Sequence, residues 1–82
     1  MKETFLKLLD SFVKQRFPFI DKFDLTVLGE KETNILIVIQ VKGKRNFSGQ
    51  EKLEIRKSIN TVFRTMGFEN NVDFVISWVL KM

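Results

Sequence analysis

The stretch of the sequence most suggestive of chemistry is Gly43–Gly49, Gly-Lys-Arg-Asn-Phe-Ser-Gly, which follows an apolar segment and precedes a predicted helix. Glycine-rich loops between a strand and a helix can bind phosphate through backbone N–H groups. A P-loop, however, ends in Gly-Lys-Ser or Gly-Lys-Thr, whereas here the lysine follows the first glycine. We therefore predict no nucleotide-hydrolysing loop, although its cations remain candidates for contact with an anion.

Residues that could support catalysis or metal binding are sparse elsewhere. The 82-residue chain has no histidine and no cysteine, which removes the commonest general base, the commonest metal ligand and every thiolate. Its serines, threonines and lysines therefore have no imidazole to activate them. Asp21 and Asp24 are close in the sequence but have no third oxygen ligand nearby. We predict a non-catalytic protein with no metal, no cofactor and no small-molecule substrate.

Positive charge is concentrated in one segment. The whole chain has a net charge of +4, whereas Lys42–Arg64 contains seven basic and two acidic residues and so carries +5. The start of the second predicted helix lies in this segment, and helix N-termini also favour anions. Six residues form a candidate surface for RNA or DNA: Lys42, Lys44, Arg45, Arg56, Lys57 and Arg64.

A competing interpretation is that this charge belongs to an ordinary solvated helix face and loop. Aromatic side chains that could stack on bases would favour nucleic acid, and Phe47 is the only candidate for an exposed one. Phe47 directly precedes the second predicted helix, and we expect it to pack against the first turn of that helix. The charge pattern alone leaves both interpretations open.

Two helices are predicted. Glu3–Phe17 has apolar residues at helical spacing, namely Phe5, Leu8, Leu9, Phe12 and Val13. Pro18 ends this helix, because the residue before a proline is disfavoured in the helical conformation. The second helix begins with a capping box of Ser48 and Glu51, and Gly67 is placed to end it in the left-handed conformation.

Three strands are predicted from apolar residues that alternate with their neighbours. They cover Phe23–Val27, Ile35–Val41 and Val72–Lys81, and Gly29–Asn34 is predicted to be a polar turn. A short turn indicates that the first two strands are antiparallel, and the crossover through the second helix indicates that the third is parallel to the second. The second strand is apolar on both sides near its middle, which favours a central position.

These elements predict a single α+β domain, an α/β sandwich over residues 1–82 with the order α-β-β-α-β. Both helices would cover one face of a three-stranded mixed sheet. This order resembles that of the K-homology-like domains of the prokaryotic kind, and also that of the ring-building modules of secretion and flagellar basal-body proteins. The Gly-x-x-Gly signature of K-homology domains is absent, since Gly43 and Gly49 have five residues between them. The resemblance therefore implies a fold and no site residue.

The sheet face without helices is the second candidate surface. It would carry an apolar strip of Leu28, Leu36, Val38, Val75 and Val79, and such strips often mark interfaces. We expect a homo-oligomer formed by two-fold stacking, or another protein partner. The competing interpretation is that chain ends cover part of the strip or that it is simply exposed. Trp78 alternates in step with Phe74 and Ile76 and is therefore assigned to the core; with the inverted register it would instead be the best hot-spot candidate on the open face.

Two functions are thus in contention. The first is a small, self-associating binding module that uses the basic surface for RNA or DNA. The second is a protein-interaction or assembly module that uses the open sheet face and has no role with nucleic acid. The longest apolar run, Ile35–Ile39, is too short to cross a bilayer, and the N-terminus lacks a signal-peptide pattern. We therefore expect a cytoplasmic location and no membrane partner.

Overall fold

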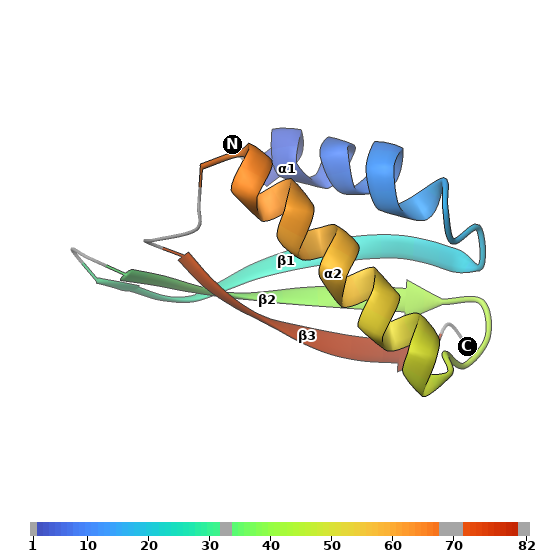
Figure 1. Ribbon diagram of the computed structural model, residues 1–82. Helices are drawn as coiled ribbons and strands as arrows, with labels where there is room; N and C mark the ends of the chain where they lie inside the picture. Colours follow the sequence, from blue (N-terminus) through green and yellow to red (C-terminus); the bar gives the residue numbers. More distant parts are fainter. Residues whose placement is uncertain (1, 32–33, 68–71, 81–82) are drawn as a thin grey trace.

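The chain forms two layers, a three-stranded sheet and a layer of helices that lies over one face of it (Figure 1). The computed structural model describes residues 2–31, 34–67 and 72–80. The elements are α1 (Lys2–Leu9), η1 (Asp10–Lys14), β1 (Ile20–Lys31), β2 (Asn34–Gly43), α2 (Gly49–Thr65) and β3 (Val72–Leu80). Since η1 continues α1, the predicted α-β-β-α-β order with two helices and a mixed sheet is confirmed.

β2 is the central strand, as predicted. It runs antiparallel to β1 and parallel to β3. Its inward side chains, Ile37, Ile39 and Val41, are buried beneath the helices. The alternate residues Leu36 and Val38 therefore belong to the face that has no helix.

The hairpin of β1 and β2 is longer than predicted. Backbone pairing continues to Lys31, which lies opposite Asn34, so the prediction of a turn over Gly29–Asn34 is wrong at both ends; residues 32–33 of that turn lie outside the described part of the chain. The ladder also shifts register at Leu28, which is the extra residue of a β-bulge. The polar composition suggested a turn, but pairing with a partner strand outweighs local preference in a sheet.

The first helix contains a π-helical turn, η1, that the sequence pattern did not predict. The residues that this helix and the following turn bury recur at every fourth position: Phe5, Leu9, Val13 and Phe17. An α-helix repeats every 3.6 residues, so a wider turn is needed to keep such a series on one side. Val13 takes the buried position in this turn, and Phe12 is 60% exposed. The assignment of Phe12 to the apolar stripe of the helix is therefore wrong.

α2 begins and ends where the sequence predicts. The Ser48 hydroxyl oxygen accepts a hydrogen bond from the Glu51 backbone N–H (3.1 Å), and the Glu51 carboxylate accepts one from the Ser48 backbone N–H (2.8 Å). Gly67 follows the last turn with φ of 78°, in the left-handed region. The helix buries Ile55, Ile59, Val62 and Phe63.

Aromatic contacts join the two layers. The Phe63 ring of α2 lies 5.1 Å from the Phe5 ring of α1 and 4.6 Å from the Phe74 ring of β3, measured between centroids. Edge-on and tilted pairs at these separations add to the stabilisation from burial. In the described part of the chain, no buried residue is polar or charged. The core is therefore held by apolar packing alone, and no polar group in it suggests a hidden site.

Gly43 supplies the first testable prediction. A Cβ atom at this position would lie 2.5 Å from Phe47 Cζ and 2.6 Å from the Arg45 carbonyl oxygen, so Gly43→Ala must displace the β2–α2 loop. We expect the substitution to lower the free energy of unfolding by about 1–3 kcal/mol, measured by urea denaturation. Gly49→Ala is the matched control, because nothing lies within 4 Å of a Cβ there and alanine favours the helix. An equal loss in both variants would contradict this explanation.

Candidate functional site

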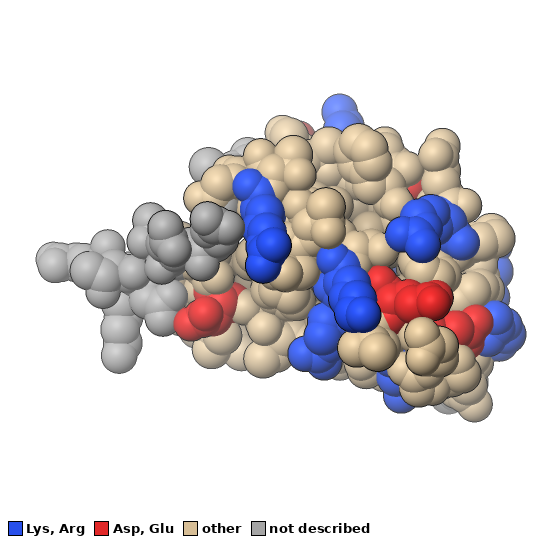
Figure 2. All heavy atoms as spheres, in the orientation of Figure 1, with Lys and Arg blue, Asp and Glu red and all other residues tan. Residues whose placement is uncertain are grey.

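The six basic residues singled out in the sequence do not form one surface. Lys42 lies on the open face of the sheet, where its Nζ atom is 3.9 Å from the Asp24 carboxylate. Lys44 and Arg45 lie in the β2–α2 loop, and the other three are exposed on α2: Arg56, Lys57 and Arg64. Figure 2 shows the Lys and Arg side chains of the helix-bearing face in separate groups, with acidic side chains beside some of them. The structure therefore brings five of the six to the helix and its preceding loop, and separates Lys42 from them.

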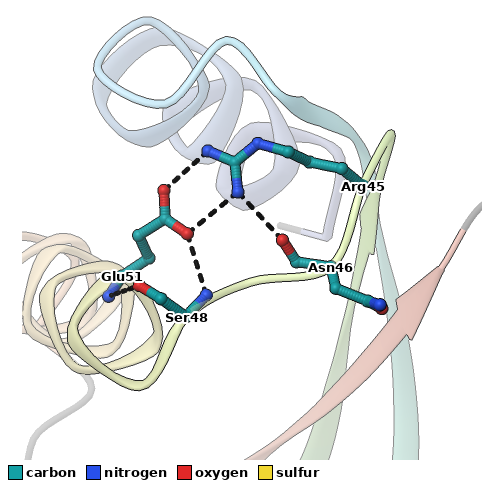
Figure 3. A network of polar contacts seen from close by, with 4 residues as sticks. All are labelled: Arg45, Asn46, Ser48 and Glu51. Carbon is teal, nitrogen blue, oxygen red and sulfur yellow. Dashed lines mark hydrogen bonds and ion pairs between the residues drawn. The ribbon is translucent and has the colours of Figure 1, made fainter.

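Arg45 is held by a polar network at the start of α2 (Figure 3). Its guanidinium donates to both carboxylate oxygens of Glu51, at 3.0 Å and 2.7 Å, and to the backbone carbonyl of Asn46 at 2.9 Å. One of these Glu51 oxygens also accepts the hydrogen bond from the Ser48 backbone N–H. Bidentate pairs of this kind are strong and directional. Arg45 therefore fixes the loop against the first turn of α2, and Glu51 compensates its charge.

This network shifts the ionisation of both partners. The hydrogen bond from Arg45, followed by that from the Ser48 backbone, lowers the pKa of Glu51 from 4.5 to about 2. The same hydrogen bond raises the pKa of Arg45 above its ordinary value. The Glu51 side chain is 23% exposed, so it remains in contact with water. The pair is thus ionised over the whole physiological range of pH.

A row of four aromatic rings crosses the same end of the molecule. Between neighbouring centroids, Phe17 and Phe19 are 6.0 Å apart, Phe19 and Phe47 are 5.4 Å apart, and Phe47 and Trp78 are 5.2 Å apart. The rings come from the turn before β1, the loop after β2 and the end of β3. Phe47 lies between Phe19 and Trp78 in this row and lines one pocket together with Lys52 of α2, so its expected packing on the first turn of α2 stays a prediction. Trp78 packs against the core, on the side predicted for it.

Three cations lie over this row of rings. The Arg45 guanidinium carbon is 3.9 Å from the centroid of Phe19, the Arg16 guanidinium carbon is 5.4 Å from that of Phe17, and Lys52 Nζ is 5.8 Å from that of Trp78. Cation–π contacts of this type stabilise both groups. Sequence reasoning missed the arrangement because its members are far apart in the chain. The one available signal was the predicted pairing of the second and third strands, which places Trp78 beside Val41 near the loop.

A pocket of about 160 Å³ lies at the Trp78 end of this row, lined by Arg45, Asn46, Phe47, Lys52, Trp78, Val79 and Leu80. Pockets for whole small molecules usually have volumes of roughly 300–1,000 Å³, so this pocket suits one group of a larger partner. Its lining combines aromatic rings, cations and an amide. Such a combination can hold a flat ring beside a negatively charged group.

The predicted interface residues are only partly gathered together. The parallel register places Val38 beside Val75, and Leu36 precedes this pair by one row on the same face. Leu36 is 38% exposed and Val75 is 49% exposed, so the centre of the predicted strip is accessible. Leu28, in the bulge of β1, is 61% exposed.

Val79, the remaining interface candidate, lies at the charged end of this face. It pairs with Lys42, whose neighbour across the sheet on β1 is Lys22. The carboxylate of Asp24 lies 3.6 Å from Lys22 Nζ and within ion-pair distance of Lys42 as well. The open face therefore has an apolar half and a polar half, which the sequence pattern did not separate.

Comparison with protein-family models, with curated proteins and with solved structures finds no match to this chain. Within residues 2–31, 34–67 and 72–80, no helix is long and apolar enough to cross a membrane. The same residues contain no group of three or more acidic side chains arranged to hold a metal ion.

The Arg45–Glu51 pair predicts a specific dependence of stability on pH. Because folding lowers the pKa of Glu51, the stabilisation is fully present above pH 4.5 and is lost as the pH falls towards about 2. Arg45→Met should therefore be less stable than the wild type at neutral pH, with a difference that shrinks across this window. The measurement is urea denaturation at a series of pH values.

An NMR titration of the Glu51 carboxyl carbon tests the cause directly. We expect a midpoint near 2 in the wild type and a midpoint much closer to 4.5 in Arg45→Met. Lys44→Met, a change of charge at the neighbouring position, should leave the midpoint of Glu51 where it is. A wild-type midpoint at the ordinary value would contradict the bidentate pair.

Proposed function

We propose that the protein is a small, non-catalytic and cytoplasmic module that binds single-stranded RNA or DNA where the β2–α2 loop meets the end of β3. The observation that carries the proposal is the pocket in which Phe47 and Trp78 lie beside Arg45 and Lys52. Proteins that bind single strands combine a basic groove for the backbone with aromatic rings on which bases stack. A base at the pocket would contact the rings while its phosphate lies near the cations.

The basic residues of α2 extend this pocket along the helix. Lys52, Arg56 and Arg64 belong to one ridge of positions spaced by four, with Asn60 between the last two. From Lys52 to Arg64 the ridge rises by roughly 18 Å, at 1.5 Å per residue. Several phosphates of one strand can be placed along such a length. Lys44 extends the positive charge on the loop side of the pocket.

A single strand fits this geometry better than a duplex. Half-buried rings at the edge of a small pocket can contact only bases that are unstacked and turned outward. In this arrangement the helix ridge contacts phosphates and not base edges, so we expect little preference for sequence. Affinity should come from phosphate contacts and from stacking.

The single tryptophan, Trp78, allows a direct test because it lines the proposed site. Titration with a ten-nucleotide oligo(dU) or oligo(rU) should quench its fluorescence. The logarithm of the affinity should fall linearly with the logarithm of the salt concentration, with a slope of about −0.7 for each phosphate contacted. Lys44→Gln and Lys52→Gln should each weaken binding and make this slope shallower.

Lys7→Gln is the matched control, because it removes the same charge from an exposed position on α1. It should leave the affinity and the salt dependence close to those of the wild type. The proposal fails if the oligonucleotide does not bind. It also fails if Lys7→Gln weakens binding as much as Lys52→Gln does, since binding would then reflect net charge alone.

We also propose, as a second candidate, that two copies associate through the open sheet face. The exposure of Leu36 and Val75 at its apolar half favours this function. Three strands about 4.8 Å apart and about 30 Å long present roughly 400 Å² of face, about half of what one partner buries in a typical stable interface. The expected dimer is therefore weak and depends on concentration.

Light scattering over increasing protein concentration tests this association. The wild-type mass should rise towards that of a dimer, whereas Val38→Lys should remain a monomer because it places a charge at the centre of the apolar half. Val27→Lys is the matched control: Val27 is 54% exposed but pairs with the inward residue Ile37, so it lies on the other side of the sheet. A wild type that remains monomeric at every concentration contradicts the dimer.

A further inference from the structure

A groove of about 290 Å³ separates the first helix from α2 and shares no residue with the proposed nucleic-acid site. Its apolar lining comes from Leu8, Phe12 and Val62. Phe12 is 60% exposed because the π-helical turn directs Val13, and not Phe12, into the core. π-Helical turns of this kind occur frequently at functional sites. The groove is therefore an apolar surface that no other described element of the fold covers.

Arg16 provides the charged part of this groove. Its guanidinium donates to the hydroxyl oxygen of Ser58 on α2, at 3.4 Å, and lies over the Phe17 ring. These two contacts hold the group in place but use only one of its five N–H donors. Among the described residues, no carboxylate lies within ion-pair distance of Arg16, and none lines the groove. A preorganised cation therefore lies beside the apolar lining, and none of the carboxylates that the structure describes is paired with it.

The two threonines of the groove use their hydroxyl hydrogens within α2. The Thr61 hydroxyl donates to the Lys57 carbonyl oxygen at 3.1 Å, and the Thr65 hydroxyl donates to the Thr61 carbonyl oxygen at 2.9 Å. Both side chains thus present methyl groups and acceptor oxygens to their surroundings. An acceptor oxygen does not attract an anion, so Arg16 is the group in the lining that would bind one. Arg16 therefore determines that a ligand of this groove should be negatively charged and that its charged end should lie at Arg16.

We propose that this groove binds a small amphiphilic carboxylate, with its hydrocarbon part against Phe12, Leu8 and Val62 and its carboxylate on Arg16. A guanidinium matches a carboxylate with two parallel hydrogen bonds, which a neutral alcohol cannot reproduce. The volume lies near the lower limit of ligand pockets, about 300 Å³, and so fits a medium-length chain or a single ring. The molecule is a ligand and not a substrate, since no nucleophile with a base lines the groove.

Titration of the isotope-labelled 82-residue chain with sodium octanoate, followed by amide NMR below the micelle concentration, tests this proposal. Octanoate should shift the amides of Phe12, Thr61 and Val62 in a saturable manner. 1-Octanol, which has the same chain length without the charge, should bind at least tenfold more weakly. Arg16→Met should lower the affinity for octanoate about tenfold while changing that for octanol less than twofold.

Two further variants separate charge from packing. Arg16→Lys keeps the charge but loses the bidentate geometry, so its affinity for octanoate should lie between those of the wild type and Arg16→Met. Arg56→Met removes an arginine from another side of α2 and should leave octanoate binding unchanged. Equal affinities for octanoate and octanol, an unchanged affinity in Arg16→Met, or shifts confined to the open sheet face would each overturn the proposal. None of these outcomes bears on oligonucleotide binding at Trp78, so the two proposals succeed or fail separately.

Discussion

The helix layer covers only one face of the sheet, and this constraint shapes every surface of the molecule (Figure 1). β2 lies in the middle of the sheet, so its inward isoleucines are buried while Leu36 and Val38 remain on a face without a covering layer. Because both helices lie on the same side, a groove is left between them. The same arrangement makes the chain cross from the end of β2 to the start of α2 at one end of the sheet. The open sheet face, the groove between the helices and the pocket at the crossover all result from having helices on one side of the sheet.

The crossover from β2 to α2 depends in turn on Glu51. This one carboxylate completes the capping box of the helix and also receives both hydrogen bonds from Arg45 (Figure 3). The loop is thereby held closely enough that Phe47 packs over Gly43, where no side chain would fit. The stretch Gly43–Gly49, whose composition suggested a phosphate loop, therefore connects β2 to α2 through contacts within the protein. The pocket of the proposed binding site is lined partly by this stretch, through Arg45, Asn46 and Phe47, and partly by Lys52 and the end of β3.

Local patterns in the sequence predicted most of the fold because they depend on neighbours in the chain. The capping box, the terminating Gly67 and the alternation in β2 are of this kind, and the structure confirms them. The π-helical turn was not predictable from apolar spacing, since Phe12 and Val13 fit a helical stripe equally well until the core selects one. The row of aromatic rings was missed for a related reason, because it joins three segments that meet only when the sheet forms.

Charge shows the same difference between composition and placement. The segment Lys42–Arg64 has a net charge of +5. Lys42, however, lies on the open face of the sheet, where it and Lys22 both contact Asp24, and Arg45 is paired with Glu51. Lys52 lies over the Trp78 ring, so in the proposed complex it would exchange part of that contact for a phosphate. This exchange offsets part of the gain from the new contact, but the charge of Lys52 still attracts the phosphate more strongly than a ring does. In the proposed complex, affinity would come from Lys52 together with Lys44, from the arginines along α2 and from a base on the exposed part of the rings.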